Sequence, residues 1–192
     1  MHNNGGIYMS LLKCLKDFVP SKSNVYSEAE MRELNIAILS ERGVSVDDIA
    51  FLAYNAQSKY LDNLSYNEME ESVLEILSKR EQFHAILMAV NIDVLAEKNM
   101  LDEPFLSIVK DDLGLFGLDE AIAISIAGNY GTIGVTNFGN LDVNKPGKIS
   151  ILQNKKTEVH CFLDDIVGAI AAVAAIRVAQ HHALEKASNA LL

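Results

Sequence analysis

The feature that most constrains the fold is a long, almost uncharged stretch near the end of the chain. Residues 166 to 176 contain no charged side chain, and the alanine-rich pattern around them predicts a helix from His160 to about Ala190. The uncharged run is shorter than the roughly 20 residues that a membrane-spanning helix requires. A helix that is apolar on most sides is usually buried. We therefore expect this helix to lie at the centre of a soluble helical bundle.

Small residues recur along the same helix, and they allow another backbone to approach closely. They are Gly168, Ala169, Ala171, Ala172, Ala174 and Ala175. This pattern suits either a central helix or a subunit interface. We expect a homo-oligomer, with the number of subunits left open.

The rest of the chain is also patterned as helices. Ser27 and Glu30 have the spacing of a capping box, which predicts a helix that ends near Gly43. Ser45 and Ser65 start similar patterns. The first of these predicts a helix to about Asn63, and the second predicts a long amphipathic helix that continues, or breaks once, before Ala96.

Further helices are expected after Pro104, which fits a first helical position, and over residues 119 to 127. Residues 131 to 141 are compatible with a helix or a loop, and residues 148 to 159 are expected to be a polar connection. The predicted fold is all-α: a single-domain helical bundle with a buried apolar C-terminal helix. We expect a loosely ordered N-terminal segment over residues 1 to 26 and one all-α domain over residues 27 to 192.

Length and charge exclude several classes of function. The 192 residues suit one compact domain, and the net charge of −10 leaves no basic stripe that could bind nucleic acid. The two cysteines, Cys14 and Cys161, form no disulfide framework, and no targeting segment is evident. We therefore expect a cytoplasmic protein without a transmembrane segment, compatible with contact at the inner face of a membrane.

Aspartates lie beside apolar helical sequence in three separate segments of the second half. These are Asp111-Asp112, Asp142 and Asp164-Asp165. Carboxylates that are pressed against a core cost several kcal/mol unless a cation pairs with them, and few lysines or arginines are close in the sequence. We therefore predict that one or two Mg²⁺ ions bind here, since this ion prefers oxygen ligands. Glu97 is a candidate sixth member of the cluster.

Each of these carboxylates also has an ordinary structural interpretation. Asp164 and Asp165 would complement the positive end of the last helix, an effect worth about 0.3–1 kcal/mol. Asp111 and Asp112 would lie on a solvated face, and Asp142 would be a turn residue. From the residues alone, both interpretations stay open.

Three segments in the same order resemble the phosphatidylglycerophosphatase A family. They are SIVKDD from Ser107, FGNLDVNKP from Phe138 and FLDDIVGAI from Phe162. The family shows S-I-V-x-D-E, F-R-x-x-D-x-x-K-P and D-D-I-V-A-G segments at similar spacing. The resemblance covers about Glu97 to Ala175, and the whole chain is similar to the soluble, all-helical branch of the family in Gram-positive bacteria.

The resemblance implies magnesium-dependent removal of the terminal phosphate from phosphatidylglycerophosphate. Asp111, Asp112, Asp142, Asp164 and Asp165 would then be metal ligands or their supports, with Glu97 as a further ligand. Asp111, Asp112 and Lys145 would take part in catalysis, and Lys145 would hold the phosphate or pair with a carboxylate. The expected partner is a phosphate ester such as a phospholipid head group.

Three departures from the family pattern bear on the substrate. Asp112 stands where the family has glutamate, and Gly139 stands where it has arginine, so a bidentate phosphate clamp is missing. The glycine- and proline-rich N-terminal part of the membrane enzymes is replaced by charged helical sequence over residues 27 to 65.

Two other functions are compatible with the sequence. A helical regulatory protein would keep the metal site without catalysis, and Gly139 favours this alternative. A helical nucleotide pyrophosphatase would use the acidic helix face of Glu68, Glu70, Glu71 and Glu75, although a solvated face explains these glutamates better.

Overall fold

The computed structural model describes residues 26 to 112, 117 to 154 and 157 to 190, and within these residues it contains helices and no strands. The predicted N-terminal segment lies almost wholly outside the described residues. The helices are α1 (Glu28–Glu41), α2 (Val46–Gln57), α3 (Tyr66–Leu77), α4 (Arg80–Glu97), α5 (Phe105–Asp111), α6 (Leu118–Gly128), α7 (Thr132–Asn144), α8 (Lys148–Gln153) and α9 (Leu163–Asn189). The prediction of an all-α fold is confirmed.

Serine caps start the first three helices, as the sequence predicted. The backbone amide of Ser27 donates to Glu30 Oε2 over 2.7 Å, and its hydroxyl accepts from the Glu30 amide. Ser45 forms the same reciprocal pair with Asp48. These bonds satisfy amides that a helix start would otherwise leave unpaired.

The structure differs from the sequence prediction in two places. The helix after Ser45 ends at Gln57, because Asp62 and Asn63 belong to a turn-favouring segment. The long helix after Ser65 breaks once, at Ser78 and Lys79 between α3 and α4, which is one of the two arrangements that the sequence left open. Residues 148 to 153 form the short helix α8 instead of a polar connection, since its two buried side chains pack into the core.

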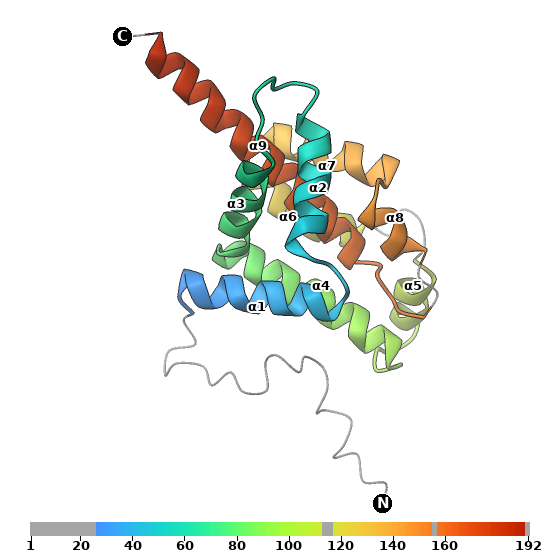
Figure 1. Cartoon of the computed structure of the whole chain (residues 1–192). Helices are drawn as coiled ribbons and strands as arrows, with labels where there is room; N and C mark the ends of the chain where they lie inside the picture. Colours follow the sequence, from blue (N-terminus) through green and yellow to red (C-terminus); the bar gives the residue numbers. More distant parts are fainter. Residues whose placement is uncertain (1–25, 113–116, 155–156, 191–192) are drawn as a thin grey trace, which may run out of the picture.

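Helix α9 is the centre of the bundle. It contacts α2, α3, α4, α6, α7 and α8, and every residue from Leu163 to Ile176 is buried. Figure 1 shows α9 passing behind α2 and extending beyond the bundle at its C-terminal end. The prediction of a buried apolar C-terminal helix is therefore confirmed. Among the described residues, no helix combines the length and the apolar character that crossing a bilayer would need.

Glycines let α6, α7 and α9 pack closely. A Cβ atom on Gly134 of α7 would collide with the carbonyl oxygen of Ala127 in α6. A Cβ on Gly168 of α9 would lie 3.4 Å from the Ile149 side chain of α8 and 3.6 Å from Phe138 of α7. Close packing at these positions brings α7 against α6 and brings the first half of α9 against α7 and the start of α8.

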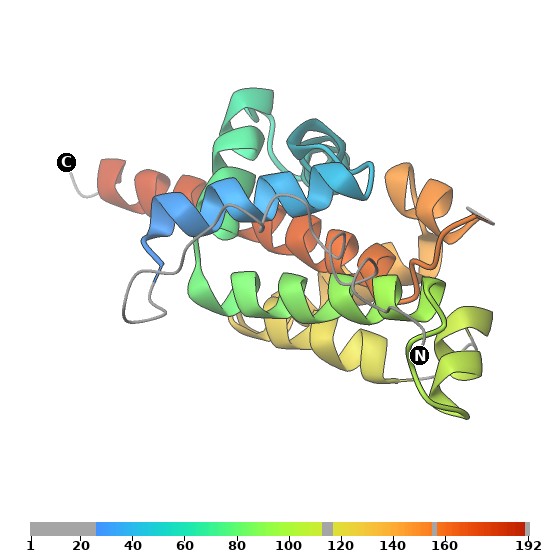
Figure 2. The same cartoon turned by 90° about the horizontal axis from the view of Figure 1, so that it is seen from below.

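Helices α1 and α4 run alongside each other at one end of the bundle, as Figure 2 shows from below. The C-terminal half of α4 carries Asp93, which is buried, and Glu97. Both side chains reach the segment that leads into α9. Helix α4 therefore positions the residues that hold the start of the central helix.

Candidate metal centre

The first turn of α9 is held by a buried carboxylate on α4. Asp93 accepts hydrogen bonds from the backbone amides of Phe162, at 3.1 Å, and Leu163, at 3.0 Å. Burial raises the pKa of Asp93 well above its ordinary value, although both amide bonds act in the opposite direction. Asp93 thus caps α9 and fixes where Asp164 and Asp165 point.

An ion pair holds the segment just before this cap. Glu97 accepts from the Val159 amide over 2.8 Å and pairs with Arg42, whose guanidinium also donates to the Val159 carbonyl over 2.8 Å. In the structure, the partners of Glu97 are therefore Arg42 and Val159, which differ from the partners of the other predicted metal ligands. Glu97 acts on the position of α9 through Val159.

Lys145, at the end of α7, joins three of the predicted ligands. Its ammonium nitrogen lies 3.0 Å from Asp164 Oδ2 and 3.1 Å from Asp165 Oδ1, and it also pairs with Asp142. Lys145 is thus a cation that these three aspartates share in the structure. Of the two roles expected for Lys145, pairing with carboxylates is the one seen.

Two acidic residues at the start of α6 belong to the same cluster, although they were not among the predicted metal ligands. Ligand oxygens of Asp119, Glu120 and Asp165 all lie within 4.8 Å of one another. Asp119 is buried, and Glu120 is half-buried and accepts from the Gly117 amide over 2.8 Å. Helix α6 therefore contributes as directly to the cluster as α9 does.

Asp112 and Cys161 extend the cluster on the other side of Asp119. Ligand atoms of these three residues also lie within 4.8 Å of one another, and the buried Cys161 thiol donates to Asp119 Oδ2 over 3.6 Å. Asp112 is exposed at the end of α5 in a left-handed conformation, with φ 44°. The neighbouring Asp111 is exposed as well, and it is in neither group of possible metal ligands among the described residues.

We call these converging residues the acidic centre: Asp112, Asp119, Glu120, Asp142, Asp164 and Asp165, with Lys145. It is assembled from the ends of α5 and α7 and the starts of α6 and α9. The three predicted segments are thus brought together, with Asp112 representing the first.

Burial in this crowded site changes the proton affinity of its members. Burial and, to a smaller extent, the neighbouring charge of Asp164 raise the pKa of Asp165 to about 8. Burial likewise raises the pKa of Asp119 to about 7 and that of Asp164 to about 6. Burial alone would lower the pKa of Lys145, but the surrounding carboxylates raise it above its ordinary value. The single lysine is therefore too little positive charge for the carboxylates that surround it.

The donor set fits a magnesium ion on one side of Asp119. Asp119, Glu120 and Asp165 offer only oxygen atoms, which this ion prefers. Asp112, Asp119 and Cys161 include a sulfur atom, which suits softer ions better. Asp119 belongs to both groups, so it is the residue that the two possible sites would share.

The missed residues carried a signal in the sequence. The S-I-V-x-D-E segment of the family contains an Asp-Glu pair, and Asp119-Glu120 is such a pair in the first turn of an apolar helix. Because SIVKDD resembles the S-I-V-x-D-E segment, the family's Asp-Glu pair was assigned to Asp111 and Asp112 instead. Asp93 carried no comparable signal, because nothing local distinguishes a buried capping aspartate on α4.

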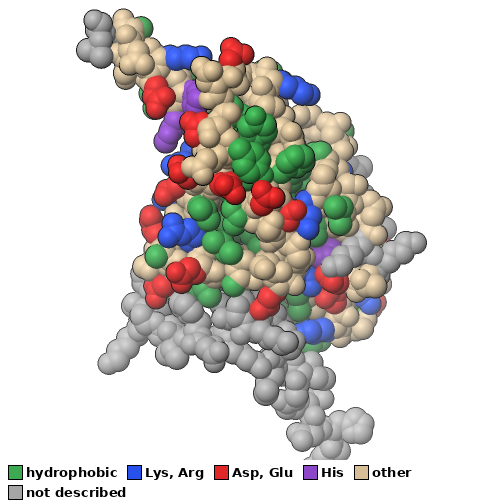
Figure 3. All heavy atoms as spheres, in the orientation of Figure 1, with side chains coloured by type: hydrophobic (Ala, Val, Ile, Leu, Met, Phe, Trp, Pro, Cys, Tyr) green, Lys and Arg blue, Asp and Glu red, His purple; other side chains and the backbone are tan. Residues whose placement is uncertain are grey.

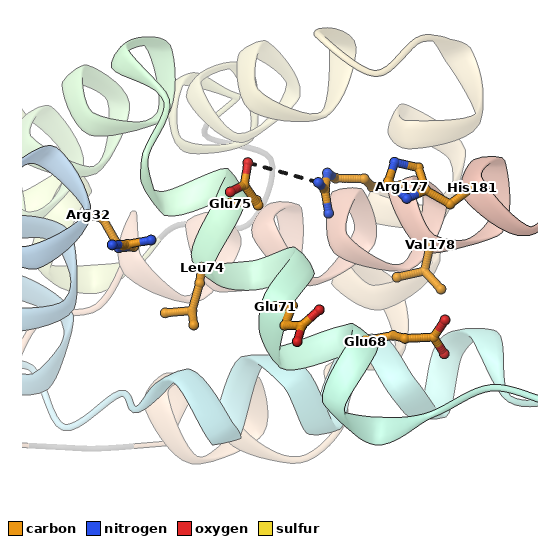
Figure 4. Close-up of a pocket in the computed structure, with 8 residues that line it drawn as sticks. All are labelled: Arg32, Glu68, Glu71, Leu74, Glu75, Arg177, Val178 and His181. Atoms are coloured by element: carbon orange, nitrogen blue, oxygen red, sulfur yellow. Dashed lines mark ion pairs between the residues drawn. The ribbon is translucent and has the colours of Figure 1, made fainter. Parts of the chain in front are cut away.

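A separate pocket of about 460 Å³ lies between α1, α3 and the second half of α9. Figure 4 shows Glu75 facing Arg177 across it, with Glu68 and Glu71 along α3. Arg177 lies 3.9 Å from Glu75, and His182 lies 2.9 Å from Glu68. Among the described residues, no group of possible metal ligands includes these glutamates. The pocket therefore gives the pyrophosphatase alternative less support than the acidic centre gives a phosphatase.

Comparison with known proteins extends the resemblance well beyond the three segments. The family model described as phosphatidylglycerophosphatase A matches residues 42 to 180. Uncharacterized proteins YpjQ and YutG of Bacillus subtilis (strain 168) are each 44% identical, over 157 and 160 residues. These matches cover 82% of the chain and 89% of YpjQ, and 83% of the chain and 95% of YutG.

Solved structures share the fold. The crystal structure of YpjQ matches with a TM-score of 0.78 at 44% identity, covering 82% of the chain and 98% of that structure. The low temperature requirement C protein from Listeria monocytogenes also matches with a TM-score of 0.78, at 43% identity, covering 81% of the chain and 99% of that structure. The bundle and the order of its helices are thus shared with these structures.

Proposed function

Because the chain belongs to the phosphatidylglycerophosphatase A family, we propose that it is a metal-dependent phosphatase that hydrolyses phosphatidylglycerophosphate or a related glycerophosphate. One observation carries the proposal: carboxylates from four separate helix ends meet at the acidic centre, where a single lysine pairs with three of them. Such an excess of carboxylates is typical of sites that bind divalent cations and, through them, phosphate.

Magnesium is the proposed cofactor, and Asp119, Glu120 and Asp165 would hold it. A bound ion of this kind polarises a phosphoryl oxygen and lowers the pKa of its water. Asp142 and Asp164 support the site by holding Lys145 in place.

The protein's own residues account for two further requirements of the reaction. Asp112 is exposed, so its carboxylate can accept a proton from a water molecule that enters the centre. Lys145 supplies a fixed positive charge, which would attract the phosphate and balance charge during transfer. Asp93 and the Arg42–Glu97 pair hold the first turn of α9 and the segment before it in place.

Phosphate release from purified protein tests the proposal. We expect release from phosphatidylglycerophosphate in mixed micelles, or from glycerol 3-phosphate, that requires magnesium and stops with EDTA. Asp165→Asn should remove this activity, whereas Asp102→Asn, at an exposed position before α5, should keep it. Absence of magnesium-dependent release from every glycerophosphate ester would defeat the proposal.

A regulatory protein that binds metal without turnover is the second candidate, and Gly139 favours it. This residue replaces the arginine of the family segment, and a Cβ at its position would meet nothing within 4 Å. Under this alternative, magnesium raises the melting temperature by binding the folded state, while no ester is hydrolysed. Gly139→Arg then offers a direct comparison, because a gain of activity would show that the missing guanidinium is what prevents catalysis.

A further inference from the structure

A second pocket lies beside the last turn of α7, the turn that also carries Asp142 and Lys145 of the acidic centre. It has a volume of about 390 Å³ and lies between α2 and the end of α7. The buried side chains of Leu52 and Leu141 form an apolar part of its lining, and Asn140 and Asn144 add amide groups. Pockets of this size with mixed lining are typical of sites for small organic groups.

The pocket and the acidic centre share the last turn of α7. Asn140, Leu141 and Asn144 line the pocket, while Asp142 and Lys145 contact each other within the centre. A ligand that occupies both the pocket and the acidic centre would therefore extend past only one turn of α7. The pocket is therefore placed to receive the organic part of an ester whose phosphate lies at the centre.

Exposed apolar side chains surround the mouth of this pocket. Phe51 lines it from α2 and Tyr60 from the turn after α2, with 52% and 77% of their surface exposed. Val143, which directly precedes the lining residue Asn144 on α7, is 82% exposed. Figure 3 shows hydrophobic side chains gathered on the face that α2 presents. Single exposed apolar residues are ordinary, but a group around a pocket marks an interaction site.

The surrounding charges narrow the choice of partner. Lys59 is the cation that lines the pocket, whereas Asp47, Asp48 and Asp62 belong to α2 and the segment after it. These mostly acidic side chains therefore argue against a nucleic acid as the partner, because its phosphates require a patch of basic side chains. A stable dimer buries about 800 Å² of complementary surface on each copy, and a rim of separate side chains around an amide-lined pocket offers little of that kind. Aromatic side chains with an adjacent lysine instead suit the interface of a lipid layer.

We propose that the rim formed by Phe51, Tyr60 and Val143 docks onto a lipid surface and that the pocket takes the glycerol side of a lipid-linked phosphate ester. The second half of this statement rests on the proposed phosphatase function, whereas the docking stands on the pocket itself. Binding should depend on insertion of apolar side chains and persist at high salt, because the chain carries a net charge of −10 and gains little attraction to anionic lipid.

The absence of tryptophan from the chain makes docking directly measurable. Phe51→Trp introduces a single indole at the rim, and Leu184→Trp introduces one on the protruding end of α9, where the side chain is 67% exposed. With vesicles of phosphatidylcholine containing a minor fraction of phosphatidylglycerol, the indole at position 51 should shift its emission to the blue and become protected from an aqueous quencher. The indole at position 184 should not change.

Three outcomes would overturn the docking proposal. They are no shift at position 51, an equal shift at both positions, and a shift that depends on protein concentration without vesicles, which would indicate a second copy. As a second measurement, the double variant Phe51→Ser/Tyr60→Ser should cosediment with vesicles about tenfold less than the parent. Leu184→Ser should cosediment like the parent, and equal losses in the two variants would also reject the proposal.

These binding measurements separate the two proposals. If the indole at position 51 enters the lipid but no ester is hydrolysed, the phosphatase proposal fails and the docking surface stands. If glycerol 3-phosphate is hydrolysed but the vesicles leave that indole unchanged, the docking proposal fails and the phosphatase proposal stands.

Discussion

The ammonium nitrogen of Lys145 lies 3.0 Å from Asp164 Oδ2, so that one ion pair joins the last turn of α7 to the first turn of α9. Asp164 is almost fully buried, and its position depends on the cap that Asp93 provides. Lys145 also contacts Asp165 and Asp142. The same lysine therefore ties two helices together and balances part of the charge at the candidate metal centre.

Replacing Lys145 with methionine should destabilise the protein strongly in the absence of metal. The variant keeps the apolar stem but leaves Asp164 and Asp165 without their cation. Breaking a buried ion pair costs about 3–5 kcal/mol. Because part of Lys145 is exposed, we expect the free energy of unfolding to fall by about 3 kcal/mol. Urea unfolding in EDTA at neutral pH measures this loss.

The matched control is Lys110→Met, since Lys110 is exposed on the surface of α5 and donates a hydrogen bond to Asn99. Its effect should stay within about 0.5 kcal/mol. Magnesium should restore part of the stability of Lys145→Met and leave Lys110→Met close to the parent. Similar losses in both variants would show that the contacts of Lys145 contribute little.

Without metal, stability should fall as the pH rises through the neutral range. Burial raises the pKa of Asp119 to about 7, that of Asp164 to about 6 and that of Asp165 to about 8. All three lie above the unfolded value of 3.8. At a pH between the unfolded and the folded pKa values, the folded state binds more protons than the unfolded state, so raising the pH favours unfolding. Lys145 has a raised pKa too, but it titrates above this range.

We expect the free energy of unfolding in EDTA to drop by about 3 kcal/mol or more between about pH 5 and pH 8.5. Magnesium should stabilise more at the higher pH, because metal ligands must be deprotonated. Thermal melts over this range, with EDTA or with magnesium, measure both effects. Stability without metal that rises between these two pH values would contradict the expectation.

The sequence could predict the bundle and much of the centre because the relevant signals are local. Serine caps, the uncharged run of α9 and the aspartate pairs are each visible within a few residues. Helix α8 was missed because its buried pair, Ile149 and Leu152, is too short a pattern to separate from a loop. Tertiary packing decides such short segments.

Contacts between distant segments explain what the sequence could not predict. Lys145 precedes Asp164 by 19 positions, and Asp93 precedes Leu163 by 70, so neither pairing has a local pattern. Glu97 was selected for its charge, but its partners, Arg42 and Val159, lie 55 and 62 positions away. Which carboxylate meets a lysine, an amide or a metal ion is set by the packing of α4, α7 and α9.

Two glycines on α7 should respond in opposite ways to alanine. Gly134→Ala places a methyl group against the carbonyl oxygen of Ala127, and α6 and α7 must move apart to accept it. Overpacking of this kind typically costs about 1–3 kcal/mol. Gly139 has nothing within 4 Å of its Cβ position. Gly139→Ala should therefore stabilise by about 0.5–1 kcal/mol, since glycine is unfavourable inside a helix. Urea unfolding compares the two, and a loss in Gly139→Ala as large as that in Gly134→Ala would contradict the packing described.

The cap on α9 should make Asp93 one of the most sensitive buried polar residues. Asp93→Ala leaves the amides of Phe162 and Leu163 without their acceptor, at a cost of about 1–3 kcal/mol for each buried group. Asp93→Asn keeps one carbonyl oxygen and should lose less. Asp102→Ala, at an exposed site, serves as the control in urea unfolding. If Asp93→Ala were as stable as Asp102→Ala, α9 would not depend on this cap.

Asp119 and Glu71 separate the phosphatase interpretation from the pyrophosphatase interpretation. Asp119 belongs to both groups of possible metal ligands, whereas Glu71 lines the pocket on α3 and accepts a hydrogen bond from Asn67. Asp119→Asn should therefore abolish the rise in melting temperature that magnesium causes and lower phosphate release at least about a hundredfold, the scale of losing one charged stabilising group. Glu71→Gln should retain both properties. Isothermal titration with magnesium and a phosphate-release assay on the same preparations measure them. If Glu71→Gln lost metal binding while Asp119→Asn kept it, the functional site would lie on α3 and the pocket in Figure 4 would be the active site.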